Sequence, residues 1–143
     1  MFSKACEYAI RSTLFIAGES QKERRTSLKE IARAINSPEA FTAKILQKLV
    51  QQNIVNSIKG PRGGFFIDKE KNTTKLAEIV RAIDGDSIMN GCALGLEKCS
   101  EDHPCPLHFD FVNIRSGLKH MLETTSIFEL SSKLVSGTSF LKL

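Results

Sequence analysis

Residues 86–106 constrain the fold most, because this segment lacks hydrophobic periodicity and yet contains three of the four cysteines. A loop of this length inside a compact chain needs something to hold it in place. The cysteines follow the pattern Cys92-x6-Cys99-x5-Cys105, and His108 comes three residues after the last of them. Thiolates are soft ligands that suit iron–sulfur clusters, zinc or copper. The pattern therefore predicts a metal centre within this loop.

The spacing favours a two-iron, two-sulfur cluster over zinc. Zinc ligands usually include close cysteine pairs such as C-x2-C, and the chain has no such pair. Wider spacing lets three thiolates converge on a larger group, and a two-iron cluster needs four ligands. If Pro106 is the first helical residue, Cys105 is the N-cap and the helix dipole favours its thiolate. His108 then reaches the same metal as fourth ligand. Structural zinc and unliganded redox thiols are the alternatives.

Two short amphipathic helices on either side of residue 37 predict a helix-turn-helix. A capping box at Ser27–Glu30 opens the first helix. Asn36 suits a helix-ending turn, Ser37 an N-cap and Pro38 the first position of the second helix. The second helix is expected to bury its apolar residues, Phe41, Ile45, Leu46, Leu49 and Val50. Its polar residues are expected to point outward, namely Thr42, Lys44, Gln47, Lys48 and Gln51.

A hairpin directly after the second helix predicts a wing. Residues 54–59 alternate like a strand, residues 60–64 form a Gly-rich turn, and residues 65–67 return. The glycines at the tip let the backbone approach a minor groove closely. We expect DNA contacts from the second helix and from the wing: Ser37, Thr42, Lys44, Gln47, Lys48, Lys59 and Arg62.

The other helices follow from apolar periodicity. A first helix capped by Ser3 ends near Gly18, with Cys6 as a buried thiol and Glu7 placed to pair with Arg11. Further helices are expected from Thr74 to Asp84, from Pro106 to about Glu123, and from Ser126 to Gly137. The fold class is thus mainly α with a small β-hairpin wing. We divide it into a winged helix-turn-helix domain (1–85), a cluster-binding loop (86–106), and a dimerisation helix followed by a C-terminal helix (107–143).

The charge is distributed unevenly along the chain. Residues 1–67 contain 11 Lys and Arg against 5 Asp and Glu, whereas residues 68–143 contain 9 against 11. A basic half followed by a mildly acidic half suits a nucleic-acid-binding part and a separate sensing or pairing part. Paired carboxylates, a Ser–His arrangement and a phosphate-binding loop are all missing from the sequence, which argues against an enzyme. Because neither a signal peptide nor a membrane-spanning run is evident, we expect a cytoplasmic protein without a membrane partner.

The chain resembles the IscR/NsrR-type (Rrf) family of bacterial winged helix-turn-helix regulators. The resemblance covers roughly residues 2 to 130, and Phe65 stands where a tyrosine is common. The residues that carry it are Glu7-Tyr8-Ala9, Leu28-Lys29-Glu30-Ile31-Ala32, Lys59-Gly60-Pro61-Arg62-Gly63-Gly64-Phe65, Ile83-Asp84-Gly85, and the trio Cys92, Cys99 and Cys105.

The resemblance implies a homodimer with crossed long helices and a two-iron, two-sulfur cluster held by the three cysteines and a fourth ligand. In some members that ligand is a His three residues after the last Cys, which His108 matches. In others it is an acidic residue on the first helix of the partner subunit, which Glu7 matches. We favour His108, because its position needs no contribution from a partner.

Together these features predict a DNA-binding transcriptional regulator, and we expect it to act as a repressor. It would act on a pseudo-palindromic operator in double-stranded DNA and sense iron–sulfur status, nitric oxide or redox state through its cluster. One alternative is a zinc-stabilised or thiol-based redox regulator without a cluster. Another is a small iron–sulfur electron-transfer protein, which leaves the basic winged part unexplained.

Overall fold

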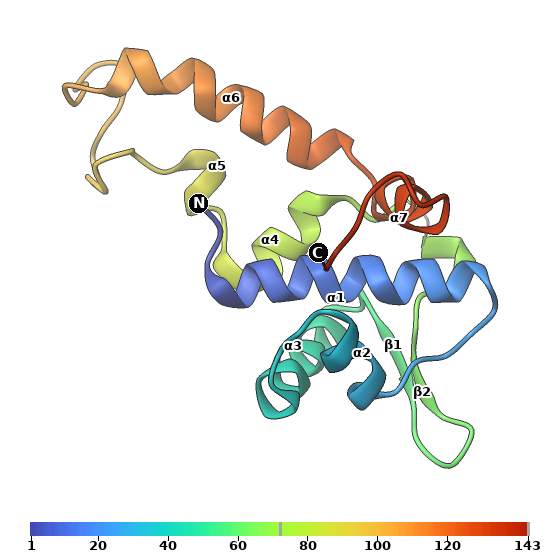
Figure 1. Ribbon diagram of the computed structural model, residues 1–143. Helices are drawn as coiled ribbons and strands as arrows, with labels where there is room; N and C mark the ends of the chain where they lie inside the picture. The colour runs from blue at the N-terminus through green and yellow to red at the C-terminus, as the bar shows by residue number, and fades with distance from the viewer. Residues whose placement is uncertain (72, 143) are drawn as a thin grey trace.

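Helix α1 (Lys4–Gln21) runs through the middle of the molecule, and the other elements lie on two sides of it (Figure 1). The protein is described here from a computed structural model that covers residues 1–71 and 73–142. The elements on one side are α2 (Leu28–Ala34), α3 (Glu39–Gln51), β1 (Asn56–Ile58) and β2 (Gly64–Phe66). Those on the other side are α4 (Leu76–Asp84), α5 (Ser87–Asn90), α6 (His108–Thr124) and α7 (Ile127–Val135). A short 3₁₀ helix, Lys69–Lys71, follows β2.

The core forms around α1, which packs against α2, α3, α4 and α7. The fully buried side chains come from all of these helices, among them Cys6, Ala9, Ile16, Ile31, Ile35, Leu46, Leu49, Ile79, Val80 and Ile127. Cys6 is thus a buried thiol, as expected. The helix continues to Gln21 instead of ending near Gly18. The reason is tertiary: the buried hydroxyl of Ser20 accepts the backbone N–H of Ile67 at 3.0 Å, so a polar turn of helix is held against the hairpin.

The turn between α2 and α3 forms largely as the sequence indicates. Ser27 and Glu30 make both bonds of the capping box. Asn36 ends the first helix in the left-handed region, with φ of 54°. The expected N-cap at Ser37 is wrong, because α3 begins at Glu39 and Pro38 takes the N-cap position without a side-chain bond. The chain stays extended one residue longer than the sequence suggested.

The wing is an antiparallel hairpin whose register pairs Ser57 with Phe65. Its strands are shorter than predicted, because only three residues of each pair before the tip turns. A Cβ atom at Gly63 would overlap the carbonyl oxygen of Ile58, so only glycine fits this turn. Thr26 bridges to Phe65 through two backbone bonds of 3.0 and 2.7 Å. The segment before α2 therefore braces the wing.

The long helix α6 joins the rest of the fold mainly through its C-terminal half. Leu122 is fully buried, and Leu118 packs against the core. By contrast, the side chains of Phe109 and Ile114 are 65% and 63% exposed. Residues 86–106 were predicted to lack regular structure, but they contain one short helix, α5. It forms because the backbone carbonyl oxygen of Asp86 accepts the N–H groups of Met89 and Asn90. Among the described residues, no helix is long and apolar enough to cross a membrane.

Candidate metal centre and nucleic-acid interface

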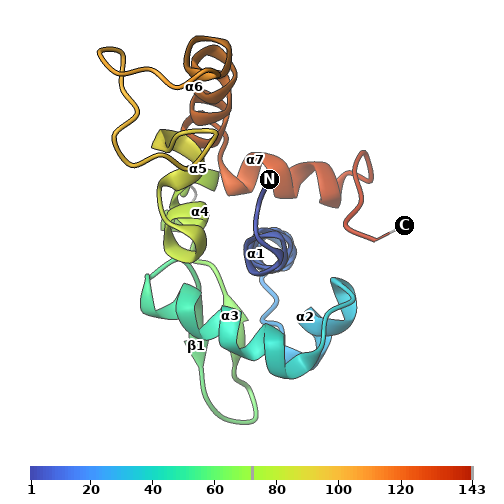
Figure 2. The same cartoon turned by 90° about the vertical axis from the view of Figure 1, so that its left-hand side faces the viewer.

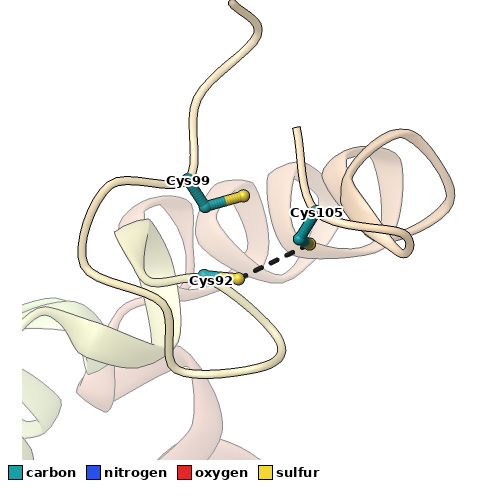
Figure 3. Close-up of side chains that lie close together, drawn as sticks. All are labelled: Cys92, Cys99 and Cys105. Carbon is teal, nitrogen blue, oxygen red and sulfur yellow. Dashed lines mark hydrogen bonds between the residues drawn. The ribbon is translucent and has the colours of Figure 1, made fainter. Parts of the chain in front are cut away.

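The three cysteines of the loop converge on one point. Cys92 follows α5, Cys99 lies in the middle of the loop, and Cys105 comes shortly before α6. Their sulfur atoms all lie within 4.8 Å of one another, and the Sγ atoms of Cys92 and Cys105 are 3.6 Å apart. The side chains point toward one another from three separate stretches of chain (Figure 3). This is the arrangement that shared metal ligands require.

His108, the first residue of α6, lies beside this group of three sulfurs and contacts one of them. Its Nδ1 atom lies 3.1 Å from the Sγ atom of Cys99, and the residue is only 8% exposed. Its buried Nε2 atom has no hydrogen-bond partner within the described part of the chain. A buried imidazole nitrogen without a partner is unfavourable, and ligation of a metal is one way to satisfy it.

Cys105 does not cap α6 as the sequence suggested. Leu107 takes the N-cap position, while the carbonyl oxygen of Cys105 accepts the N–H of His108 at 3.0 Å. Burial raises the pKa of the Cys105 thiol, instead of a helix dipole lowering it. Cys92 is the acidic thiol: the backbone N–H groups of Leu96 and Leu94 lower its pKa to about 7. The residues after Cys105 form a turn, which aims its sulfur back at Cys92.

Glu7, the alternative fourth ligand, lies on the first turns of α1. Its carboxylate pairs with Lys4 at 3.1 Å, so the expected pairing with Arg11 is wrong. Arg11 instead stacks over the ring of Tyr8 at 4.5 Å and donates to the carbonyl oxygen of Ile35. A cation over an aromatic face gains energy without a carboxylate, which explains the change of partner. The Glu7 side chain is 43% exposed.

Helix α3 and the wing lie together on the face of the molecule opposite α6 and the cysteine loop (Figure 2). Lys44, Gln47 and Lys48 are exposed on α3, and Lys59 and Arg62 are exposed at the wing tip. The side chain of Arg25, which the sequence analysis did not single out, donates to the carbonyl oxygen of Arg62 at 3.0 Å. The exposed cations thus come from elements that lie on the same side of the molecule (Figure 2).

The burial of Thr42 and Phe41 is the reverse of the prediction, which expected Phe41 inside and Thr42 outside. Thr42 is fully buried, and its hydroxyl lies 3.0 Å from the Oγ of Ser37 and 2.9 Å from the carbonyl oxygen of Pro38. The expected base contact from Thr42 is therefore wrong. Phe41 is 36% exposed, and its ring meets Tyr8 edge to face at 5.6 Å. Ile45, Leu46 and Leu49 are buried as expected, so the departure is confined to the first turn of α3, where the ring of Phe41 packs on α1.

Comparisons with known proteins agree on one class. The profile of the Rrf2 family, described as iron-dependent transcriptional regulators, matches residues 2–133. A putative HTH-type transcriptional regulator of Aquifex aeolicus is 30% identical over 132 residues, which cover 91% of this chain and 90% of that one. The HTH-type transcriptional regulator NsrR of Geobacillus kaustophilus is 26% identical, with 95% of this chain and 92% of that one covered.

Among solved structures, IscR of T. potens superposes with a TM-score of 0.74 at 16% identity. The match covers 97% of this chain and 91% of that chain. At this identity the likeness shows the fold alone. It agrees with the expected class, a mainly helical winged helix-turn-helix with a small hairpin.

Proposed function

The chain belongs to the Rrf2 family of transcriptional regulators, and from this premise we propose that it is a repressor carrying a two-iron, two-sulfur cluster on Cys92, Cys99, Cys105 and His108. Members of this family are regulators, not enzymes. Membership of a family of transcriptional regulators also argues against the alternative of an iron–sulfur electron-transfer protein, which gave the winged helix-turn-helix no role. The observation that carries the proposal is the convergence of the three sulfurs beside His108.

The donors match a two-iron group in number and kind. The three sulfurs lie within 4.8 Å of one another, and the Nδ1 atom of His108 lies 3.1 Å from the Sγ atom of Cys99. A two-iron cluster with four protein ligands needs that number of donors. Soft thiolates and one imidazole also match its preference for sulfur and nitrogen. When bound, such a group supplies one-electron redox chemistry and sensitivity to nitric oxide or to loss of iron.

The chain's own residues would connect this site to DNA. Ser37, Lys44, Gln47 and Lys48 on or beside α3 would face the major groove, with Lys59 and Arg62 of the wing over the minor groove. The lysines and the arginine would neutralise phosphates, whereas Gln47 would contact base edges. This interface lies across α1 from the cysteines, so a signal would travel through the helices between them.

We further propose that the regulator is a cytoplasmic homodimer on a pseudo-palindromic operator. Support comes from α6, on which Ile114 and Met121 lie two turns apart on one face and are 63% and 41% exposed. Apolar side chains gathered on one helix face are typical of a pairing surface. Two copies would place two α3 helices about one turn of DNA apart.

The test is anaerobic purification, followed by an absorbance spectrum and assays of iron, sulfide and zinc. We expect equal amounts of iron and sulfide in the wild type and their loss in Cys99→Ala. The control is Cys6→Ala, which alters a thiol buried in the core and outside the group of three cysteines, and which should retain the cluster. A colourless protein that contains zinc would replace the cluster with the zinc-stabilised alternative.

A second candidate, a thiol-based redox regulator, is favoured by the short distance between Cys92 and Cys105. Metal-free wild-type protein whose DNA binding changes on oxidation of these two thiols would establish it. Either way the chain's regulatory class stays the same.

A further inference from the structure

Arg115 reaches from α6 to the start of the cysteine loop. It lies two helical turns after His108, and therefore on the same face of the helix. Its Nη1 atom donates to the carbonyl oxygen of Gly91 at 2.6 Å, across 24 residues of sequence. Gly91 directly precedes Cys92, so this bond fixes the backbone from which the first cysteine projects.

Gly91 is a rigid point of attachment. Its N–H donates to the carbonyl oxygen of Ser87 at 2.7 Å, which ends α5. A Cβ atom at this position would lie 2.5 Å from that same oxygen, so no larger residue fits without a shift. One turn further along α6, Lys119 lies 3.4 Å from the side-chain oxygen of Asn90. The start of the loop is thus held to α6 chiefly by Arg115.

Arg115 also borders the cysteines. Its half-buried side chain lines the same small site as Cys92, Cys99, Cys105 and His108. Over residues 1–71 and 73–142, no carboxylate lies within 4.0 Å of its guanidinium nitrogens. Arg81 provides the contrast, because Asp86 and Glu123 compensate its charge at 2.8 and 2.9 Å. A partly buried cation that lacks a carboxylate partner is stabilised when another negative charge lies close to it.

We propose that Arg115 is a positioning residue of the cysteine site, which pins the loop at Gly91 and offers its positive charge to the bound cluster. The inference rests on the proposed function. Three thiolates and a neutral imidazole leave a two-iron, two-sulfide group with net negative charge, and reduction adds to it. One N–H of the guanidinium serves Gly91, and the others remain for sulfur acceptors. Arg115 therefore favours the reduced, more negative form.

The two roles are separated by two substitutions. Arg115→Gln removes the charge and shortens the reach to Gly91, whereas Arg115→Lys keeps the charge and loses the planar donor group. Lys133→Gln is the control, because it removes one exposed positive charge from α7 without touching the start of the loop. In the cluster-free full chain, hydrogen exchange of the amides of residues 91–95 should be about tenfold faster in both Arg115 variants, as expected for loss of one charge-assisted bond. Exchange should be unchanged in Lys133→Gln.

The loaded proteins test the charge. The midpoint potential of the cluster, followed by absorbance, should become more negative in Arg115→Gln and should return toward the wild-type value in Arg115→Lys. Unchanged exchange in Arg115→Gln would overturn the pinning role, and an unchanged potential would overturn the role of the charge. A wild type that holds no iron or sulfide would refute the proposed cluster, while the exchange comparison would still decide whether Arg115 pins the loop.

Discussion

The imidazole of His108 faces the thiol of Cys99, with Nδ1 3.1 Å from Sγ, although nine residues separate them. The contact joins the first turn of α6 to the middle of the cysteine loop, where backbone bonds alone give little support. The Sγ atoms of Cys92 and Cys105 form another close contact, at 3.6 Å. His108 is therefore positioned to ligate without help from another subunit.

Replacing His108 by Ala should destabilise the cluster, because one of its four ligands disappears. We expect release of iron to a chelator to be at least about tenfold faster than in the wild type, the scale seen when support for a metal ligand is lost. Glu7→Ala should release iron at the wild-type rate, since that carboxylate pairs with Lys4. The reverse result would assign the fourth ligand to Glu7 of a second subunit.

The cluster-free chain should show one acidic thiol. The pKa of Cys92 is lowered to about 7 from an ordinary 9.0 by the backbone N–H groups of Leu96 and Leu94, so its reactive thiolate forms as the pH rises through about 7. Burial raises the pKa of Cys6 to about 12. Alkylation by iodoacetamide, mapped by mass spectrometry from pH 6 to 9, should modify Cys92 first and leave Cys6 intact until the protein unfolds. Equal labelling of both would be inconsistent with this site.

Features of the sequence that depend on neighbouring residues predicted the structure well. The capping box at Ser27 needs only Glu30, three residues away, and both of its bonds form. Asn36 takes the left-handed conformation that ends a helix, and Gly63 lies where only glycine fits. The convergence of the cysteines followed from their chemistry, although spacing alone gave no distances.

Features that depend on distant partners were missed. In the first turn of α3, Phe41 packs against Tyr8, and Thr42 turned inward and joined Ser37. Pro106 is compatible with a helix start, but the chain turns there because Cys105 packs toward Cys92. Arg115 could have been noticed as a cation seven residues after His108 on the same helix face. Only the fold, however, places Gly91 within its reach.

Loss of a cation from the proposed interface should lower the salt dependence of DNA binding. For Lys48→Ala, the slope of log affinity against log salt should shrink by about one unit, because one phosphate contact is removed. Binding to a generic duplex of fixed length measures this without knowledge of the operator. Lys133→Ala, an exposed charge on α7, is the control and should leave the slope unchanged. An unaltered slope in Lys48→Ala would exclude that contact.

Thr42→Val should act on stability and not on base recognition. Valine keeps the shape of the side chain but removes the hydroxyl that bonds the part-buried oxygens of Ser37 and Pro38. We expect the free energy of unfolding in urea to fall by about 0.5–1.5 kcal/mol, the usual net contribution of a hydrogen bond. Relative affinities for different DNA sequences should stay the same at temperatures where the variant is folded. Altered sequence preference with full stability would restore Thr42 as a DNA contact.

A charge in the middle of the exposed face of α6 should separate the proposed dimer. Ile114 is 63% exposed, and Met121, two turns further along the same face, is 41% exposed. A glutamate at this position would be buried against a second copy without a partner for its charge, which is unfavourable. Ile114→Glu should therefore sediment as a monomer at concentrations where the wild type is a dimer. The matched control is Asn113→Glu, which adds the same charge at the adjacent exposed polar position. Because a monomer contacts one half-site, Ile114→Glu should also lose most of its affinity for DNA carrying both half-sites, while circular dichroism shows unchanged helix content. If Ile114→Glu still sediments as a dimer, pairing uses a surface other than this face of α6.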